Sequence, residues 1–386
     1  MLIFAACYPG AQTSYNAQRL RTFAGTNHGS ALDHDLTVAD DRYQRYCPGG
    51  CRIKVMKNPL NIDELSDCID AAGYPSGTAV AVGVSGPFGA DIVKTTGFTP
   101  EGIAFSPDTM IYTGSLAKQV TAACAALLVQ SGELNTDHAI TNWLEELPAW
   151  ANSIRVRHLI HHTADFPAEV VVWDEMQAFC TQDRTSLGVI EALARLSNHQ
   201  ANPGVAYDYS GCGYICLALI IERVTAQPLS VFANEHIFEP LNMPDSCFWS
   251  GPAPKPGRGV ALGKALAPAP LSLGDGGLWS TLFDLLRWND GLNYRKLSVS
   301  DIVHTVGSLD DGTPLDYAWG TRVFTDQGVQ IQSHGGSWPG STAKLLRLPE
   351  HKLSIAALAL DDDVDRIVAM SAAILDCLRV RVAAQR

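Results

Sequence analysis

Residues 115–134, SLAKQVTAACAALLVQSGEL, are apolar around the whole circumference of a helix. Such a helix has no face suited to water, so it is buried on all sides. The rest of the chain must therefore surround it. With 386 residues, of which 46% are hydrophobic, the chain is long enough to build that core in one large domain or two intimate ones.

Helix and strand patterns flank this segment in a simple order. Before it, residues 61–73 have helical spacing, and two apolar runs at 78–86 and 90–98 are joined by a Gly/Pro turn, which predicts a hairpin. Helical patterns follow it at 187–197, 212–226, 229–237 and 282–292. Strand patterns then cover 317–325, 328–333, 341–348 and 352–360, and a closing helix covers 364–381.

This order predicts an α+β fold. We expect an antiparallel sheet flanked by helices and built from both chain ends, with a mostly helical domain inserted between them. Residues 1–58 have no sustained period and are expected to form an N-terminal extension, possibly partly disordered. Residues 59–386 would form the main domain. Its sheet subdomain would comprise 59–112 and 315–386, its helical subdomain 113–314, with a cleft where the two meet.

Charge and composition exclude several classes of partner. The net charge is -12 with a pI near 5.3, so nucleic acids and anionic membranes would repel the surface. No run of about 18 apolar residues predicts a transmembrane helix. The ten cysteines are scattered through apolar segments, which favours free thiols in a reducing compartment. We therefore expect a cytoplasmic protein without nucleic-acid or membrane partners; the sequence leaves its oligomeric state open.

The motif SLAK (115–118) opens the buried helix. A helix places residues i and i+3 on one face, so Ser115 and Lys118 are expected side by side. Ser115 would meet the positive end of the helix dipole, with its backbone N–H available to an oxyanion. Burial disfavours the ammonium form, so the pKa of Lys118 is expected to lie below about 10.4. Such a lysine can take a proton from a serine.

The SLAK motif has simpler interpretations as well. A lysine that snorkels from a helix end would give the same pattern. Ser341 and Lys344 also match S-x-x-K, but they lie in a strand pattern, where residues i and i+3 point to opposite faces. The motif alone therefore does not decide the function.

Two further motifs carry possible chemistry. Tyr209 lies in YDYSG, just before a helical pattern, and a phenol near a lysine can shuttle a proton to a leaving group. His334 lies in HGGS at the end of a strand pattern, where Gly335 and Gly336 would let a ligand approach the backbone. The edge of that strand could donate a second oxyanion N–H. Taken singly, an aromatic residue at a helix start and a β-turn explain them equally well.

Metal and cofactor motifs are poorly represented. His158, His161, His162 and Asp165 (RHLIHHTAD) have a metal-like composition, but the H-E-x-x-H pattern is absent, so packing and capping are favoured. The chain also has no Gly-x-Ser-x-Gly elbow, P-loop or G-x-G-x-x-G motif. We expect neither a metal nor another cofactor.

In their order along the chain, SLAK, YSG and HGG resemble the motifs of the serine β-lactamase and penicillin-binding protein superfamily, in its class C β-lactamase, D-peptidase and esterase branch. The family's motifs are S-x-x-K, Y-x-N, and K-T-G or H-x-G. Three further segments are similar to it: RHLIHHTADFP, PGVAYDYSGCGY with the helical region that follows, and GDGGLWSTLFDLLRW (274–288). The resemblance covers about residues 60–380 and implies a β-lactamase/transpeptidase-like fold.

The resemblance also implies roles for individual residues. Ser115 would be the acylated nucleophile, Lys118 its general base and Tyr209 a proton carrier. His334 would stand where other members have the lysine of K-T-G. The oxyanion would be bound by the N–H groups of Ser115 and Ser337. Gly211, Gly335, Gly336, Ser337 and Trp338 would contact the substrate.

One departure affects the expected substrate. Gly211 replaces the asparagine that normally contacts the lysine and the substrate's amide, which argues against β-lactamase activity and widens the acyl pocket. The first hypothesis is a serine hydrolase that cleaves a small ester or amide through acyl-Ser115. An acyltransferase of the same mechanism, which passes the acyl group to an amine or alcohol of a metabolite, is the second. The third is a catalytically inactive binding protein.

Overall fold

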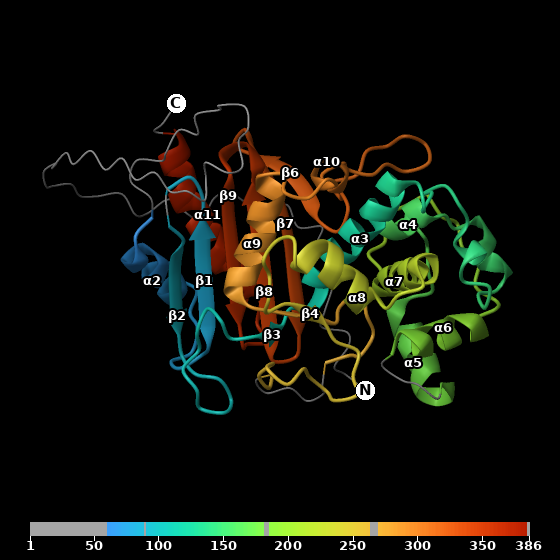
Figure 1. Cartoon of the computed structure of the whole chain (residues 1–386), viewed down its shortest axis with the longest axis horizontal. Coiled ribbons are helices and arrows are strands. Elements are labelled where there is room, and N and C mark those ends of the chain that lie inside the picture. The colour runs from blue at the N-terminus through green and yellow to red at the C-terminus, as the bar shows by residue number, and fades with distance from the viewer. Residues whose placement is uncertain (1–59, 89, 181–184, 263–268, 384–386) are drawn as a thin grey trace, which may run out of the picture. The chain divides into compact units, whose positions relative to one another are not determined.

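The computed structural model describes residues 60–88, 90–180, 185–262 and 269–383. The expected extension at 1–58 lies outside the described residues. Described helices and strands follow the expected order along the chain (Figure 1).

A six-stranded antiparallel sheet forms the centre of the described domain. Its order across the sheet is β2 (Ile92–Thr96), β1 (Val80–Ser85), β9 (Leu353–Ala359), β8 (Ser341–Leu348), β7 (Val329–Trp338) and β6 (Arg322–Asp326). Val80 pairs with Ala359, so the first and last strands lie side by side. The predicted α+β sheet built from both chain ends is confirmed.

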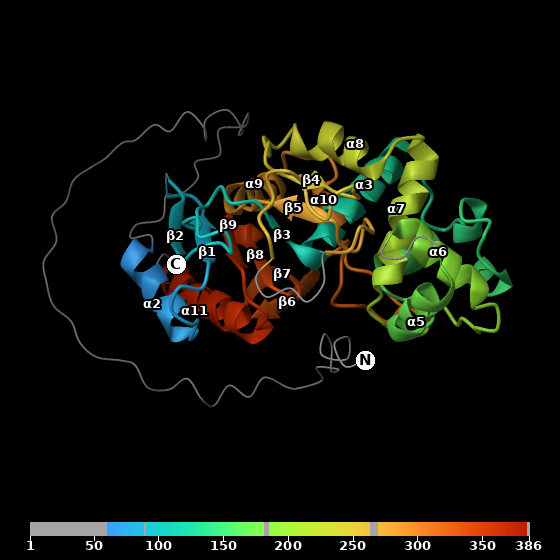
Figure 2. The same cartoon turned by 90° about the horizontal axis from the view of Figure 1, so that it is seen from below.

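Alternation along the strands divides the core into two layers. In β9, Ile355 and Ala357 pack against α2 (Ile62–Ala71) and α11 (Val364–Ala383), whereas Ala356 and Leu358 face the other layer. That other layer contains α9 (Leu282–Asn293) and the helical part of the chain. Figure 2 shows α2 and α11 on one face of the sheet and α9 on the other.

The helical part is arranged around the apolar segment that begins at Ser115. It contains α3 (Ala117–Ser131), α4 (Val156–Ile160), α5 (Glu169–Phe179), α6 (Ser186–Arg195), α7 (Gly211–Thr225), α8 (Leu229–Ala233) and α10 (Ser300–Val303). Ten of the first eleven α3 residues are buried in sequence, from Ala117 to Ala126, and Leu128 follows. The predicted all-round burial is therefore confirmed.

Several boundaries differ from the expectations. Ser115 lies in a 3-10 turn, η1 (Gly114–Leu116), and the α-helix starts only at Ala117. Residues 317–321 are not strand, because a bridge between Tyr317 and Arg322 turns the chain before β6. A small sheet of β3 (Ile111–Tyr112), β5 (Leu278–Ser280) and β4 (Cys247–Phe248) was not expected, since strands of two or three residues leave no periodic pattern.

No single helix among the described residues is long and apolar enough to cross a membrane. One pair, Gly211–Thr225 with Leu229–Phe238, reaches that length and composition only when its two helices are taken together, and it is bent by 83°.

Candidate active site

Ser115 and Lys118 lie where the small sheet meets α3. Lys118 Nζ is 3.1 Å from Ser115 Oγ, so the turn from η1 into α3 keeps the i, i+3 contact despite its 3-10 start. The Lys118 side chain is 1% exposed, whereas Ser115 is partly exposed. The pair therefore combines a reachable hydroxyl with a buried amine.

Lys118 is held from the opposite side by the 272–277 loop. Its Nζ donates to the backbone carbonyl of Asp275 at 2.9 Å. It also lies over the rings of Tyr209, at 4.9 Å from the centroid, and Tyr214, at 5.8 Å. These contacts fix the amine against the Ser115 hydroxyl.

Tyr209 lies beside the same pair, with its ring centroid 4.9 Å from Lys118 Nζ. Burial raises the pKa of its phenol, and the Ser115 side chain opposes that shift only in part, so the phenol stays neutral near pH 7. His162 positions the loop that carries Tyr209. The His162 carbonyl accepts from Asp208 N at 2.7 Å, and His162 Nδ1 accepts from Ser210 N at 3.1 Å. The His162 and Tyr209 ring centroids are 4.3 Å apart.

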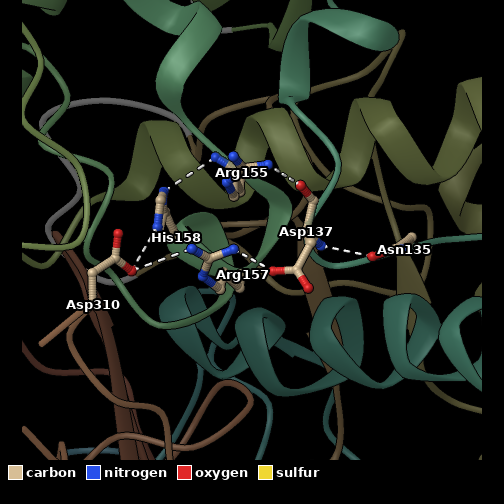
Figure 3. A network of polar contacts seen from close by, with 6 residues as sticks. All are labelled: Asn135, Asp137, Arg155, Arg157, His158 and Asp310. Atoms are coloured by element: carbon tan, nitrogen blue, oxygen red, sulfur yellow. Dashed lines mark hydrogen bonds and ion pairs between the residues drawn. The ribbon is translucent and has the colours of Figure 1, made fainter. Parts of the chain in front are cut away.

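The other histidines of this segment also have structural contacts. His158 Nδ1 accepts from Arg155 N, and its Nε2 lies 3.4 Å from Asp310 Oδ1 (Figure 3). Arg157 joins the same carboxylate at 3.3 Å, and Asp310 N donates to Gly204 O in the loop that leads to Tyr209. Within the described ranges, no three His, Cys, Asp or Glu side chains are placed to share a metal ion.

His334 bonds a partner that the motifs do not reveal. Its Nδ1 lies 2.6 Å from Gly335 O, an acceptor, so Nδ1 carries the proton. Its Nε2, 3.1 Å from the Tyr317 hydroxyl, then accepts from that phenol. Burial, reinforced by the Lys118 charge, lowers the pKa of His334 to about 3, so the ring is neutral at physiological pH.

The HGGSW segment (334–338) lies in strand β7 and does not form the β-turn that was the alternative explanation of this motif. Strand β6 pairs with β7 only as far as Ser333, which lies opposite Arg322. Beyond Ser333, this edge of β7 lies against η1. A Cβ on Gly336 would lie 1.9 Å from Thr113 O and 3.0 Å from Ser115 N, and one on Gly114, at φ +53°, only 2.6 Å from Ser337 N. These two glycines bring the Ser115 and Ser337 amides into one place.

Two other predicted contact residues lie at the margins. Gly335 faces Lys344 of β8, with its Cβ position 4.0 Å from Lys344 Nζ. Trp338 packs edge-on against Tyr112 at 6.4 Å between centroids, toward the small sheet. The second S-x-x-K match, Ser341 to Lys344, lies in β8 as expected, and Ser341 Oγ donates to Tyr112 O at 2.6 Å.

Gly211 is the first residue of α7, and two carboxylates face it. A Cβ at this position would lie 2.8 Å from Glu169 Oε1 and 3.3 Å from Asp275 Oδ2. The Gly211 N–H donates to Glu169 Oε1. Loss of hydration raises the pKa of Asp275 to about 6, and the Lys118 charge counteracts this. Neither carboxylate was foreseen: Asp275 lies within GDGG but has no motif of its own, and Glu169 begins an unexpected helix.

A serine and a buried lysine in contact, beside a tyrosine and the edge of a strand, form the arrangement that the sequence predicted for a serine acyl-transfer site, on an antiparallel sheet. The chain belongs to the beta-lactamase family, whose family model matches residues 75–373.

The relatives agree with this assignment. The chain is 25% identical to penicillin-binding protein 4* of Bacillus subtilis, over 64% of this chain and 59% of the relative. It is 26% identical to a D-aminopeptidase of Cereibacter sphaeroides, over 63% and 49%. The chain thus spans about half to three fifths of the length of these relatives.

A solved D-amino acid amidase of Ochrobactrum anthropi, complexed with L-phenylalanine amide, has the same fold. It superposes with a TM-score of 0.68 at 19% identity, over 82% of this chain and 98% of that one. The predicted β-lactamase/transpeptidase-like fold is therefore confirmed. The relatives' names are those of peptidases, amidases and penicillin-binding proteins, which supports serine hydrolase chemistry.

Proposed function

We propose that the protein is a serine hydrolase that cleaves a small amide or ester through an acyl-Ser115 intermediate. The observation that carries the proposal is the 3.1 Å contact between Ser115 Oγ and the buried Lys118 Nζ. A neutral amine in this position can accept the hydroxyl proton as Ser115 attacks a carbonyl carbon.

The remaining steps follow from the neighbours of that pair. The backbone N–H groups of Ser115 and Ser337 would bind the oxyanion of the tetrahedral intermediate. Tyr209, whose ring lies under Lys118 Nζ at 4.9 Å from the centroid, would pass the proton to the leaving group. Water would then attack the acyl-enzyme, with Lys118 again as the base, and release the acid.

His334 would serve this site as a neutral group. With Nδ1 bonded to Gly335 O and Nε2 to Tyr317, it offers no positive charge to a substrate carboxylate. In this respect it cannot replace the lysine of K-T-G. Gly335, Gly336 and Trp338 would line the path of the substrate along β7.

The same arrangement would also serve an acyltransferase, since an amine or alcohol would replace water after the same acyl-enzyme. A catalytically inactive binding protein would need no contact between Ser115 and Lys118. We also propose a cytoplasmic location, in keeping with the free thiols of the described cysteines, such as the buried Cys124 and Cys216.

Mass spectrometry after treatment with a fluorophosphonate tests the proposal. We expect one adduct, on Ser115, and none in Ser115→Ala; an unlabelled wild type would leave the binding protein as the better description. Acyl donors incubated with and without added amines then separate the two enzymes. Amide or ester products formed at the expense of the free acid would favour the acyltransferase.

A further inference from the structure

We propose that Arg347 of β8 is a positioning residue for the acylation of Ser115, because its buried charge favours the neutral form of Lys118 that takes the serine proton. The inference rests on the proposed acyl-Ser115 hydrolase and adds to it a residue that lies outside all three motifs.

The guanidinium of Arg347 is enclosed by side-chain amides from three other elements. Arg347 is 2% exposed. Its Nη1 donates to Gln119 Oε1 of α3 at 3.0 Å and to Asn289 Oδ1 of α9 at 3.1 Å. Its Nε and Nη2 donate to Gln332 Oε1 of β7 at 3.1 and 3.0 Å. This side chain therefore connects α3, α9 and β7 to β8.

No carboxylate pairs with Arg347 in the part of the chain that the structure describes, so its partners are neutral. Burial lowers the pKa of the guanidinium to about 9, which still leaves it charged at pH 7. A buried cation without a counter-ion is costly. Apolar side chains of similar volume often replace even paired buried charges without loss of stability. Packing alone therefore does not explain an arginine at this position.

The amide of Gln119 is also used at a cost. Its Oε1 accepts from Arg347 Nη1 and from Trp288 Nε1, at 3.2 Å, and both of these groups are donors, so the orientation of the amide is fixed. Its Nε2 is then buried without a hydrogen-bond partner among the described residues. A glutamate would accept both bonds, supply a counter-ion and leave no N–H unsatisfied. The glutamine keeps the charge of Arg347 uncompensated.

This charge is bonded to the sequence neighbours of the reacting groups. Gln119 follows Lys118 in α3, and Gln332 lies two residues before His334, on the same face of β7. A like charge disfavours the ammonium form of a lysine. Across one helix diameter, roughly 10–12 Å, and at an effective dielectric constant of about 20, it lowers a lysine pKa by about one unit.

The other groups around the two cations leave this effect in place. Burial raises the pKa of the phenols and lowers the pKa of the imidazoles that face Lys118 or Arg347, so these groups are neutral near pH 7: Tyr209, Tyr214, His162, His334 and His304. Asp275 acts in the opposite direction, because its carboxylate favours the ammonium form of Lys118, and Glu169 faces Asp275. Arg347 therefore offsets the charge of Asp275.

Gln119→Glu and Gln332→Glu test the proposal, since each gives Arg347 a carboxylate from a different element. We expect the ascending limb of the pH–rate profile for fluorophosphonate labelling of Ser115 to move up by about one pH unit in both variants. Labelling at a pH below the limb should then slow by about tenfold. The urea concentration at the unfolding midpoint should rise at the same time. Gln130→Glu, at an exposed position in the same helix, should leave the limb in place.

A purely structural role would raise stability in the glutamate variants without moving the limb, and that result in either folded variant would overturn the proposal. Arg347→Lys provides a second test, because an ammonium keeps the charge but cannot reach all three amides. Its stability should fall while the limb stays near its wild-type pH; a limb that moves up as in Gln119→Glu would also contradict the role of the charge. A wild type that is not labelled on Ser115 would instead overturn the proposed function.

Discussion

Replacing Tyr317 with Phe removes the hydroxyl that bonds His334 Nε2 at 3.1 Å. Tyr317 is 0% exposed and His334 only 7%, so water does not readily replace the lost donor. An unsatisfied buried acceptor costs about 1–3 kcal/mol. We expect the free energy of unfolding to fall by that amount in urea denaturation, with an unchanged m-value.

Tyr74 provides the matched control. Its hydroxyl is also buried, but it has no hydrogen-bond partner within the described part of the chain. Tyr74→Phe therefore removes a hydroxyl without stranding an acceptor, and its stability should be unchanged or higher. If Tyr317→Phe were as stable as Tyr74→Phe, the assigned tautomer of His334 would be wrong.

The substitution should also affect catalysis through His334. Without Tyr317, the bond from Nδ1 to Gly335 O still keeps the proton on Nδ1, so the lone pair of Nε2 is left to accept from a group of the reacting pair instead. We expect kcat for p-nitrophenyl acetate to fall while fluorophosphonate labelling of Ser115 persists. An unchanged kcat would mean that His334 is not part of the reaction's environment.

Three further predictions follow from the site and its charges. Lys118→Ala and Lys118→Arg should remove the ascending limb of the pH–rate profile for Ser115 acylation, and a limb that persists in both variants would exclude Lys118 as the base. Burial lowers the pKa of His161 to about 4 and the pKa values of His304 and His334 to about 3. Below pH 6.5 these histidines therefore bind protons in the unfolded state but not in the folded state. The urea concentration at the unfolding midpoint should therefore be lower at pH 4.5 than at pH 7. Asp275 and Asp290, with pKa values raised to about 6, act in the opposite direction between about pH 4 and 6. A midpoint that rises on acidification would contradict the histidine assignment. Because Gly211 offers no amide to an acylamido side chain, at a cost of about 1–3 kcal/mol, a chromogenic cephalosporin should be turned over at least tenfold more slowly than a p-nitrophenyl ester, and fast cephalosporin hydrolysis would refute this reading of Gly211.

The reacting pair could be predicted because its geometry is local. Ser115 and Lys118 are three residues apart in one helical turn, and the contact survives even though that turn is 3-10. Burial of α3 could likewise be read from its apolar circumference. Tyr209 and His334 needed a further step, since only their order along the chain and the resemblance connected them to Ser115.

The partners of these residues could not be predicted. Tyr317 reaches His334 across 17 residues, and Asp275 reaches Lys118 across 157 residues through a backbone carbonyl, which has no sequence signature. Glu169 and Gly211 meet only because α5 and α7 are packed by the tertiary fold. Contacts of this kind depend on how the layers pack, and no local pattern records them.

The pairing of Val80 with Ala359 has a consequence for synthesis on the ribosome. Strand β1 is among the first elements made, yet its neighbour β9 follows about 270 residues later, which is roughly 15–50 s at ordinary rates of translation. During that time the β1–β2 hairpin carries an open, apolar edge on the β1 side. Chains that stop before Leu353 would keep this edge permanently, so truncated products should aggregate instead of accumulating as partly active enzyme.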